Sequence, residues 1–444
     1  MKAHNRYSAA RVSGAIAFLV GVVLSGVTVQ AVLPAGTSVQ QWNKIAEDTV
    51  VGSGAFQNEG LIYMAYVSSA VYDAVVAIEG GYEAYASEIG APPGASLDAA
   101  VVEAAYWTLR HYFSVQAATL DALHSEALAL IPDGPAKIDG RAVGHSAAVA
   151  IIALRSGDGR LTPIGASSTF DTEPPAPGVW RLTPPFALPQ TPWVASVEPF
   201  ILKKPGQFQP RQPAPLASQA WVDQFDEIKS YGRMTGSART PEQTAIARFW
   251  TANAIRQYNR LGRDIMSARS LDRLESARLA AMINVVGADA QMSVMNSKYQ
   301  FLFWRPVTAI DPTAVSADGF GPVPGLDDGN ERTVEETGWR PLITTPNHPE
   351  YPAAHGSLTS AIAEVLSDFL GTEHIDVTIR GFDAAGAAGN LDAVRHFESA
   401  NQLRGEIVEA RLWAGLHYRG SSEAGVDLGR KVAHYALNHA FRAR

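Results

Sequence analysis

Long stretches in which apolar residues recur at helical spacing are the feature that most constrains the fold of this 444-residue chain. Alanine and leucine dominate these stretches, and the strict alternation typical of half-buried strands is nearly absent. The sequence therefore predicts an all-α fold, with helices packed as bundles and joined by long ordered Pro-rich loops. The predicted helices cover residues 64–78, 97–113, 140–154, 242–266, 274–304, 356–370 and 392–416.

Two stretches lose this helical pattern, residues 157–216, which are rich in proline, and residues 311–346. A disordered linker would lack large apolar anchors, so we expect the first stretch to be an ordered loop wrapped over the bundle. Its anchors are Trp180, Phe186, Trp193 and Phe200. No compositional break demands two folding units, so residues 32–444 are predicted to form a single domain whose catalytic core covers about 240–444.

The first 31 residues have the pattern of an export signal. A basic leader precedes the mostly apolar residues 12–27, and Val29-Gln30-Ala31 supplies the small residues that signal peptidases require. We therefore predict cleavage and a secreted or periplasmic protein. The alternative is an uncleaved membrane anchor over residues 12–33, which is just long enough to span a bilayer.

Charge and cysteine content exclude several classes of function. The net charge of −8 favours neither nucleic acid nor an anionic membrane surface, so a bound anion would need a local basic pocket. The absence of cysteine excludes disulfides, thiol catalysis and Cys-ligated metals.

The segment TPNHPEYPAAHGSLTSAI at residues 345–362 is the first candidate site. Its prolines hold residues 346–352 extended, and a helical composition follows directly. His355 is therefore expected in the first turn of a helix, where free N–H groups and the helix dipole favour an anion.

Lys298 and Arg305 form a second candidate. Seven residues separate them, so on the predicted helix they lie two turns apart on one face, before Pro306 ends it. Steps of seven extend this polar seam back to Gln291 and Asn284 on an otherwise apolar helix, as expected for a buried anion site. The alternative is the solvated edge of a surface helix.

Arg411 and His417 form a third. On a helix, a spacing of six puts them about 120° apart, so they converge only if the helix loosens, and Gly415 offers a place for this. Taken alone, a histidine such as His417 is more often a packed side chain than a ligand.

These motifs occur in one order, K-x6-R-P at residues 298–306, P-x-Y-P-x-x-H at 349–355 and R-x5-H at 411–417. Together they resemble the signature of the superfamily of vanadium-dependent haloperoxidases and type 2 phosphatidic acid phosphatases, and the chain looks most like the bacterial haloperoxidase branch. Each motif alone is weak, whereas three in order are specific.

The resemblance implies a vanadate cofactor, with hydrogen peroxide, a halide and a small organic acceptor as partners. It assigns His417 as the axial ligand of vanadium(V), or as the nucleophile in a phosphatase, and His355 as the acid–base residue. Lys298 would also polarise bound peroxide. The groups implied to hold the equatorial oxygens are Lys298, Arg305, Arg411 and the backbone N–H of Ala354.

His348, seven residues before His355, lies where the family's chloride-oxidising members often carry an aromatic residue and the bromide-oxidising members a histidine. The resemblance thus implies a catalytic His348 and a preference for bromide or iodide. A turn residue between prolines is the equally weighted alternative.

The chain departs from the family pattern at three places. Ala353-Ala354 replaces Ser-Gly, which removes one hydrogen bond to the anion and costs about 1.5–3 kcal/mol. Ser421 stands where an acid usually orients the axial histidine, so Glu423 or a distant carboxylate would have to replace it. Ala410, in place of the phosphatase serine, favours the haloperoxidase branch.

Three functions therefore remain open. The favoured one is a secreted vanadate-dependent haloperoxidase. The second is an acid-phosphatase-like phosphomonoester hydrolase with His417 as nucleophile, disfavoured by the missing acid. The third is a decayed, non-catalytic oxyanion-binding helical protein, suggested by Ala353 and Ala354. A homo-oligomer is compatible with each, whereas zinc chemistry lacks HExxH spacing.

Overall fold

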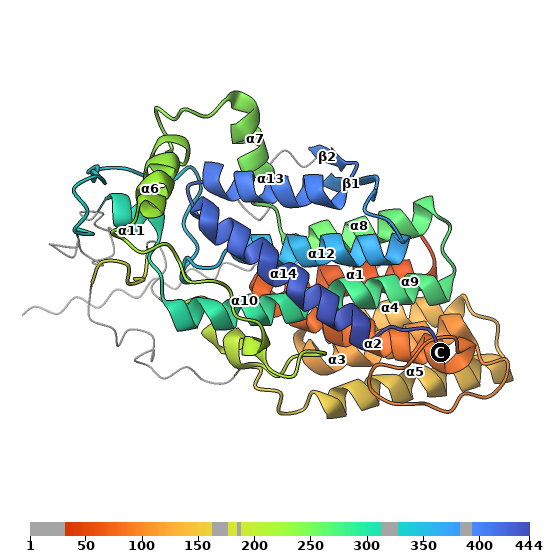
Figure 1. Ribbon diagram of the computed structural model, residues 1–444. Coiled ribbons are helices and arrows are strands. Elements are labelled where there is room, and N and C mark those ends of the chain that lie inside the picture. The colour runs from red at the N-terminus through yellow and green to blue at the C-terminus, as the bar shows by residue number, and fades with distance from the viewer. Residues whose placement is uncertain (1–31, 162–175, 184–187, 312–326, 382–392) are drawn as a thin grey trace, which may run out of the picture. The chain divides into compact units, whose positions relative to one another are not determined.

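The computed structural model describes residues 32–161, 176–183, 188–311, 327–381 and 393–444 (Figure 1). The predicted export signal and the anchor Phe186 lie outside these residues. The all-α prediction is confirmed, because helices predominate in the described part. Its strands are one antiparallel pair, β1 (Val377–Arg380) and β2 (Val394–Phe397), in which Val377 lies opposite Phe397.

The helices differ in length from one turn to six. In chain order they are α1 (Ser38–Gly52), α2 (Gln57–Glu79), α3 (Leu97–Tyr112), η1 (Ser114–Gln116), α4 (Ala117–Ala129), α5 (Pro135–Leu154), η2 (Pro192–Ser196), η3 (Pro205–Gln207), α6 (Gln219–Tyr231), α7 (Pro241–Phe249), α8 (Ala254–Ala268), α9 (Arg273–Ala281), the π-helical turn η4 (Met282–Val286), α10 (Gly287–Phe301), α11 (Pro306–Ile310), α12 (Ala354–Leu370), α13 (Ala400–Trp413) and α14 (Arg419–His439).

Two predicted helices are interrupted. The helix expected over residues 242–266 is two helices, α7 and α8, because Asn253 caps α8 by accepting hydrogen bonds from the N–H groups of Ile255 and Arg256. The helix expected over 392–416 begins only at Ala400, after strand β2. Helices α1, α4, α6, α11 and α14 were not predicted.

The expected helix over residues 274–304 is also wrong at its end. α10 stops at Phe301, where Leu302 adopts a left-handed conformation with φ 46°. Pro306 begins α11 rather than ending α10, as its fixed φ favours. Lys298 and Arg305 therefore belong to different elements, and the seven-residue seam does not describe their geometry.

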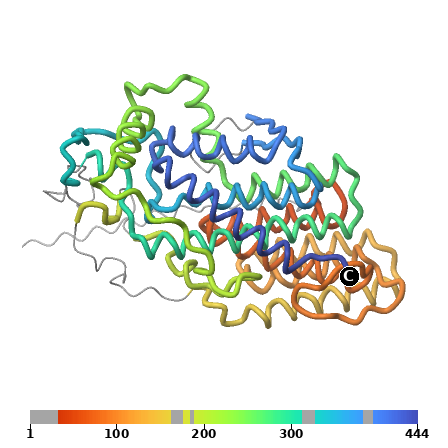
Figure 2. The backbone as a smooth tube through the Cα atoms, viewed as in Figure 1, coloured from red at the N-terminus to blue at the C-terminus, as the bar shows by residue number. Residues whose placement is uncertain are grey.

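Close contact between α12 and α14 positions two of the candidate motifs (Figures 1 and 2). A side chain at Gly425 would come within 2.3 Å of the Ala353 carbonyl oxygen, and one at Gly429 within 2.0 Å of that of Ser357. Only glycine permits this approach. This close packing brings the first turn of α12, which carries His355, against the part of α14 that follows His417.

The described part of the Pro-rich stretch is ordered and anchored as predicted. Trp180 and Phe200 are buried, and Trp193 is half-buried. The buried carboxylate of Asp289 on α10 accepts hydrogen bonds from three consecutive backbone N–H groups, those of Phe200, Ile201 and Leu202, at 2.6–2.9 Å. Burial raises the pKa of Asp289 to about 6, although these hydrogen bonds oppose the shift.

Among the described residues, α2 is the one helix long and apolar enough to cross a membrane by length and composition. Of its most apolar window, 89% is buried inside the structure. It packs against α3, α5 and α9, the surroundings of a core helix.

Candidate active site

Lys298 lies in the last turn of α10 and is fully buried. Its Nζ donates hydrogen bonds to the carbonyl oxygens of Pro349 at 2.8 Å and Glu350 at 2.9 Å. Burial, and then the neighbouring charge of Arg305, holds the pKa of Lys298 well below its usual value. The loop part of the middle motif, residues 349 and 350, thus fixes the position of this cation.

Arg305 precedes α11 and is also fully buried. Its Nε donates to the His348 carbonyl oxygen at 3.0 Å, and its Nη1 to the Leu416 carbonyl oxygen at 2.9 Å. Nη1 also lies 3.1 Å from Nε2 of His417. Burial lowers the pKa of Arg305 to about 10, so it stays charged at neutral pH. All three candidate segments of the sequence therefore meet at this one guanidinium.

His417 is held in one tautomer by two partners. A guanidinium can only donate, so Nε2 of His417 is the acceptor toward Arg305. Nδ1 consequently carries the proton and donates to Oε1 of Glu350 at 2.9 Å. Burial and the surrounding cations keep the pKa of His417 well below its usual value. The ring is thus neutral, with its Nε2 lone pair directed into the cationic cluster.

Glu350 is the functional candidate that the sequence analysis missed. It is fully buried, and its Oε1 also accepts the backbone N–H of Tyr418 at 3.1 Å. Burial raises its pKa to about 7, whereas Lys298 and Arg305 act in the opposite direction. Its place in the middle motif, between two prolines, was a usable signal, but nothing in the sequence linked it to His417.

The carboxylate that orients His417 is therefore Glu350, which confirms the expected alternative of a distant carboxylate, whereas the suggestion of Glu423 is wrong. Glu423 is half-exposed and pairs with Arg211 at 3.0 Å. Ser421, in the position of the usual acid, donates through Oγ to the Glu350 carbonyl oxygen at 3.4 Å.

Arg411 lies in the last turn of α13, and its Nη1 donates to the Trp250 carbonyl oxygen at 3.1 Å. The chain unwinds after Trp413, and Gly415 has φ 76°, as the spacing of Arg411 and His417 required. Burial, and then Arg305, lowers the pKa of Arg411 to about 9. Its Nε is buried without a partner.

His355 is the second residue of α12, as predicted, and follows Ala354. Its Nε2 is buried without a hydrogen-bond partner. Burial lowers the pKa of His355 well below the usual value, and Arg411, Lys298 and Arg305 add to the shift. The N-cap residue, Ala353, has no side chain to cap the helix, so the first-turn N–H groups receive no bond from it.

His348 is held against the same cluster. Its Nδ1 accepts a hydrogen bond from Nη2 of Arg305 at 3.0 Å. Burial, followed by Lys298 and Arg305, keeps its pKa well below the usual value. His348 therefore fixes Arg305, a structural contact that a simple turn residue would not make.

The cluster contains three cationic side chains, those of Lys298, Arg305 and Arg411, against the single carboxylate of Glu350. Buried charges and polar atoms normally find partners, yet Nε2 of His355 and Nε of Arg411 have none. A tetrahedral oxyanion such as vanadate or phosphate fits this donor set, because it presents several acceptor oxygens and a negative charge. Nε2 of His417 is the atom that would bond such a group.

Residues 278–444 match the family model described as the VCPO second helical-bundle domain. This carboxy-terminal part is similar to the vanadium haloperoxidase family. The match includes every candidate site residue named above.

Among curated proteins, vanadium chloroperoxidase of Curvularia inaequalis is 23% identical over 244 residues, 44% of this chain and 39% of that protein. The chain thus matches about two-fifths of that relative's length. A bacterial vanadium-dependent iodoperoxidase has TM-score 0.71 at 21% identity, covering 92% of this chain and 98% of its own. A holo-type bacterial vanadium-dependent chloroperoxidase has TM-score 0.66 at 18% identity, with 89% and 93% covered. At these identities the structures establish a shared fold.

Proposed function

We propose that the protein is a vanadate-dependent haloperoxidase that oxidises halide with hydrogen peroxide to hypohalous acid. What supports this most is the hydrogen bond from His417 Nδ1 to Glu350, which leaves the Nε2 lone pair facing Arg305. A histidine fixed in this way is what an axial ligand requires.

In this proposal Nε2 of His417 would bond the vanadium, and Lys298, Arg305, Arg411 and the N–H of Ala354 would hold the oxyanion. Bound vanadate supplies a Lewis acid that activates hydrogen peroxide toward halide. The cations hold negative charge in a site that excludes water, and they need no reorganisation to do so. His355, neutral because burial lowers its pKa, accepts or returns a proton at its unpartnered Nε2.

The halide is proposed to be bromide or iodide. His348 supports this preference by the family resemblance. Initial rates with chloride, bromide and iodide at equal concentration test the assignment. A faster rate with chloride would refute it.

One purified preparation tests the activity itself. Peroxide-dependent bromination of a phenol should appear on adding orthovanadate and vanish in His417→Ala. The same samples should then be assayed for p-nitrophenyl phosphate hydrolysis without vanadate. Absence of both activities, together with absence of vanadate binding, would instead indicate a decayed oxyanion-binding protein.

Phosphomonoester hydrolysis is the second candidate function. Glu350 supports it, since an oriented and neutral His417 is also what a histidine nucleophile needs. The absence of an acid after His417 is therefore a weaker objection than the sequence suggested. Vanadate-independent hydrolysis that is lost in His417→Ala would favour this candidate over the first.

We also propose that the protein is secreted or periplasmic after loss of residues 1–31. Amino-terminal sequencing of the protein from its native host should then begin at Val32. A start at Met1 in a membrane fraction would favour the uncleaved anchor.

A further inference from the structure

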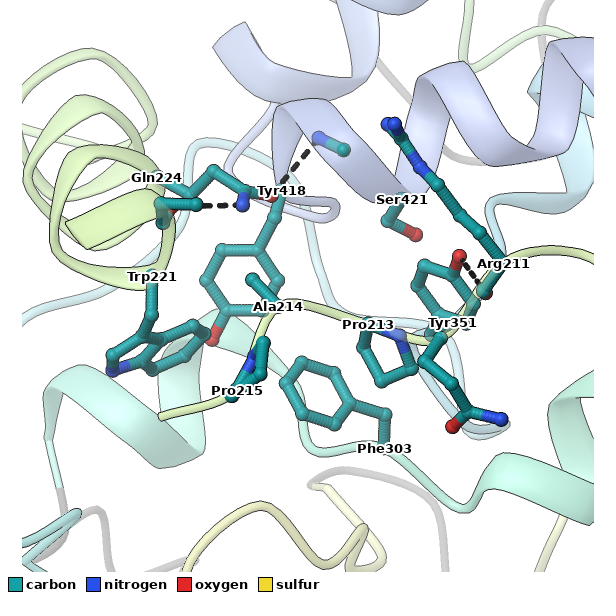
Figure 3. Close-up of a pocket in the computed structure, with 13 residues that line it drawn as sticks. Arg211, Pro213, Ala214, Pro215, Trp221, Gln224, Phe303, Tyr351, Tyr418 and Ser421 are labelled. Carbon is teal, nitrogen blue, oxygen red and sulfur yellow. Dashed lines mark hydrogen bonds between the residues drawn. The ribbon is translucent and has the colours of Figure 1, made fainter. Parts of the chain in front are cut away.

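A cavity of about 330 Å³ borders the candidate active site (Figure 3). Its lining comes from the loop before α6, from α6 itself, from the loops that follow α10 and precede α12, and from the start of α14. Four of the lining residues are aromatic and two are prolines. The lining residues that matter here are Ala214, Pro215, Trp221, Phe303, Tyr351 and Tyr418.

The cavity and the active site share neighbouring residues. Tyr351 directly follows Glu350, and Tyr418 directly follows His417. Ser421 lines the cavity and donates to the Glu350 carbonyl oxygen at 3.4 Å. The cavity therefore lies next to the pair that orients the proposed axial ligand.

The aromatic rings of the lining favour an aromatic ligand. The ring centroids of Trp221 and Tyr418 are 5.0 Å apart. The ring centroid of Phe303 lies 5.9 Å from that of Trp221 and 6.0 Å from that of Tyr418. All three pairs are edge-to-face, an arrangement that a further ring can extend. The volume is at the low end of ligand pockets, roughly 300–1,000 Å³, so it suits a one-ring molecule.

One polar group of the lining lacks a partner. Tyr418 is only 2% exposed, and its buried hydroxyl forms no hydrogen bond. An unpaired buried hydroxyl is costly, and a ligand with a polar group would relieve that cost. The neighbouring amide of Gln224 is already engaged, by the N–H of Gly420 and the carbonyl oxygen of Ala220.

We propose that this cavity binds a small phenol, with the ring among the aromatic side chains and its hydroxyl bonded to Tyr418. The role of the bound phenol as the compound to be halogenated rests on the proposed haloperoxidase function, because hypohalous acid halogenates electron-rich phenols. It does not rest on that function for its test, which measures binding alone.

The test is a fluorine NMR titration of the purified, vanadate-free protein with 4-fluorophenol and with 4-fluorotoluene, which lacks the hydroxyl. The phenol should bind at least about fivefold more tightly, the worth of one hydrogen bond. Ala214→Phe, which fills the cavity, should weaken phenol binding at least about tenfold. Ala153→Phe, at an exposed alanine of α5, is the matched control and should bind like the wild type. Tyr418→Phe should erase the preference for the phenol.

Equal binding of the two probes, or unchanged phenol binding in Ala214→Phe, would overturn the assignment. Wild-type oxidation of iodide to triiodide with peroxide and vanadate, which requires no organic acceptor, tests the proposed function separately. Phenol binding as expected without iodide oxidation would refute the proposed function. Iodide oxidation without the expected phenol binding would refute the role proposed for the cavity.

Discussion

Oε1 of Glu350 accepts the Nδ1 proton of His417 at 2.9 Å, and neither side chain is exposed to solvent. This contact joins the middle and last motifs, and it sets which nitrogen of His417 is free to bond. Glu350 acts through His417, so it is a positioning residue rather than a catalytic one. The first prediction concerns this pair.

Glu350→Gln should weaken vanadate binding by roughly 10- to 100-fold, the usual effect of losing a residue that orients a metal ligand. Glutamine keeps the shape and one acceptor oxygen but removes the charge, so Glu350→Ala should lose more. Isothermal titration with orthovanadate measures the affinity. Glu423→Gln, at a half-exposed carboxylate paired with Arg211, is the matched control and should bind normally. Equal affinities in the two glutamine variants would show that Glu350 does not position His417.

His355→Ala should lower halide oxidation by roughly 100- to 10,000-fold, the range for loss of a general acid–base group. Vanadate affinity should change much less, because His355 is not a proposed ligand. Steady-state rates at saturating vanadate separate the two effects. His434→Ala, whose side chain is 72% exposed on α14, is the control. A parallel fall in affinity and rate would place His355 among the groups that hold the anion.

Ala353→Ser should raise the free energy of unfolding by about 1 kcal/mol, because serine at an N-cap accepts a first-turn N–H that alanine leaves open. Vanadate binding should be retained or tightened. Urea unfolding and titration calorimetry measure the two quantities. Ala353→Cys has nearly the same volume but is a weak acceptor, so it should give little of this stabilisation. Weaker vanadate binding in the serine variant would mean that Ala353 does not face the anion.

Asp289→Asn should destabilise the fold by about 1–3 kcal/mol for each backbone N–H left without an acceptor. Asparagine has one carbonyl oxygen for the three N–H groups that Asp289 now binds. Asp133→Asn, at a fully exposed side chain, should change stability by no more than about 0.5 kcal/mol.

The difference in unfolding free energy between the wild type and Asp289→Asn should also depend on pH. Burial raises the folded-state pKa of Asp289 to about 6, above the value of an unfolded aspartate. Folding therefore favours the protonated form, and the contribution of Asp289 to stability falls as pH rises through about 6. The difference between wild type and Asp289→Asn should widen as pH falls from 7 to 5. A constant difference in urea unfolding across this range would contradict the assignment.

Local sequence signals predicted the helix start and the helix end that carry site residues better than they predicted contacts between distant segments. The prolines before Ala354 placed His355 in a first helical turn, and Gly415 marked the point where the chain unwinds after Arg411. Both signals act within a few residues, so they can be read without knowledge of the fold.

Contacts between distant segments could not be read in the same way. The pattern through Asn284 and Lys298 suggested one continuous helix to Arg305, because periodicity does not register the left-handed turn at Leu302. Asn284 instead bonds to Ser68 and Asn259, away from the cations. The role of Glu350 depends on a partner 67 residues further along the chain, and no local pattern reports it.

The segment from His348 to His355, a loop that leads into the first turn of α12, has a consequence for how such a chain can vary. Its carbonyl oxygens at 348, 349 and 350 receive Arg305 and Lys298, its one acid receives His417, and its last residue is the proposed proton carrier. Inserting or deleting one residue here would shift all of these groups out of register together. The length of this segment should therefore tolerate less change than any helix around it.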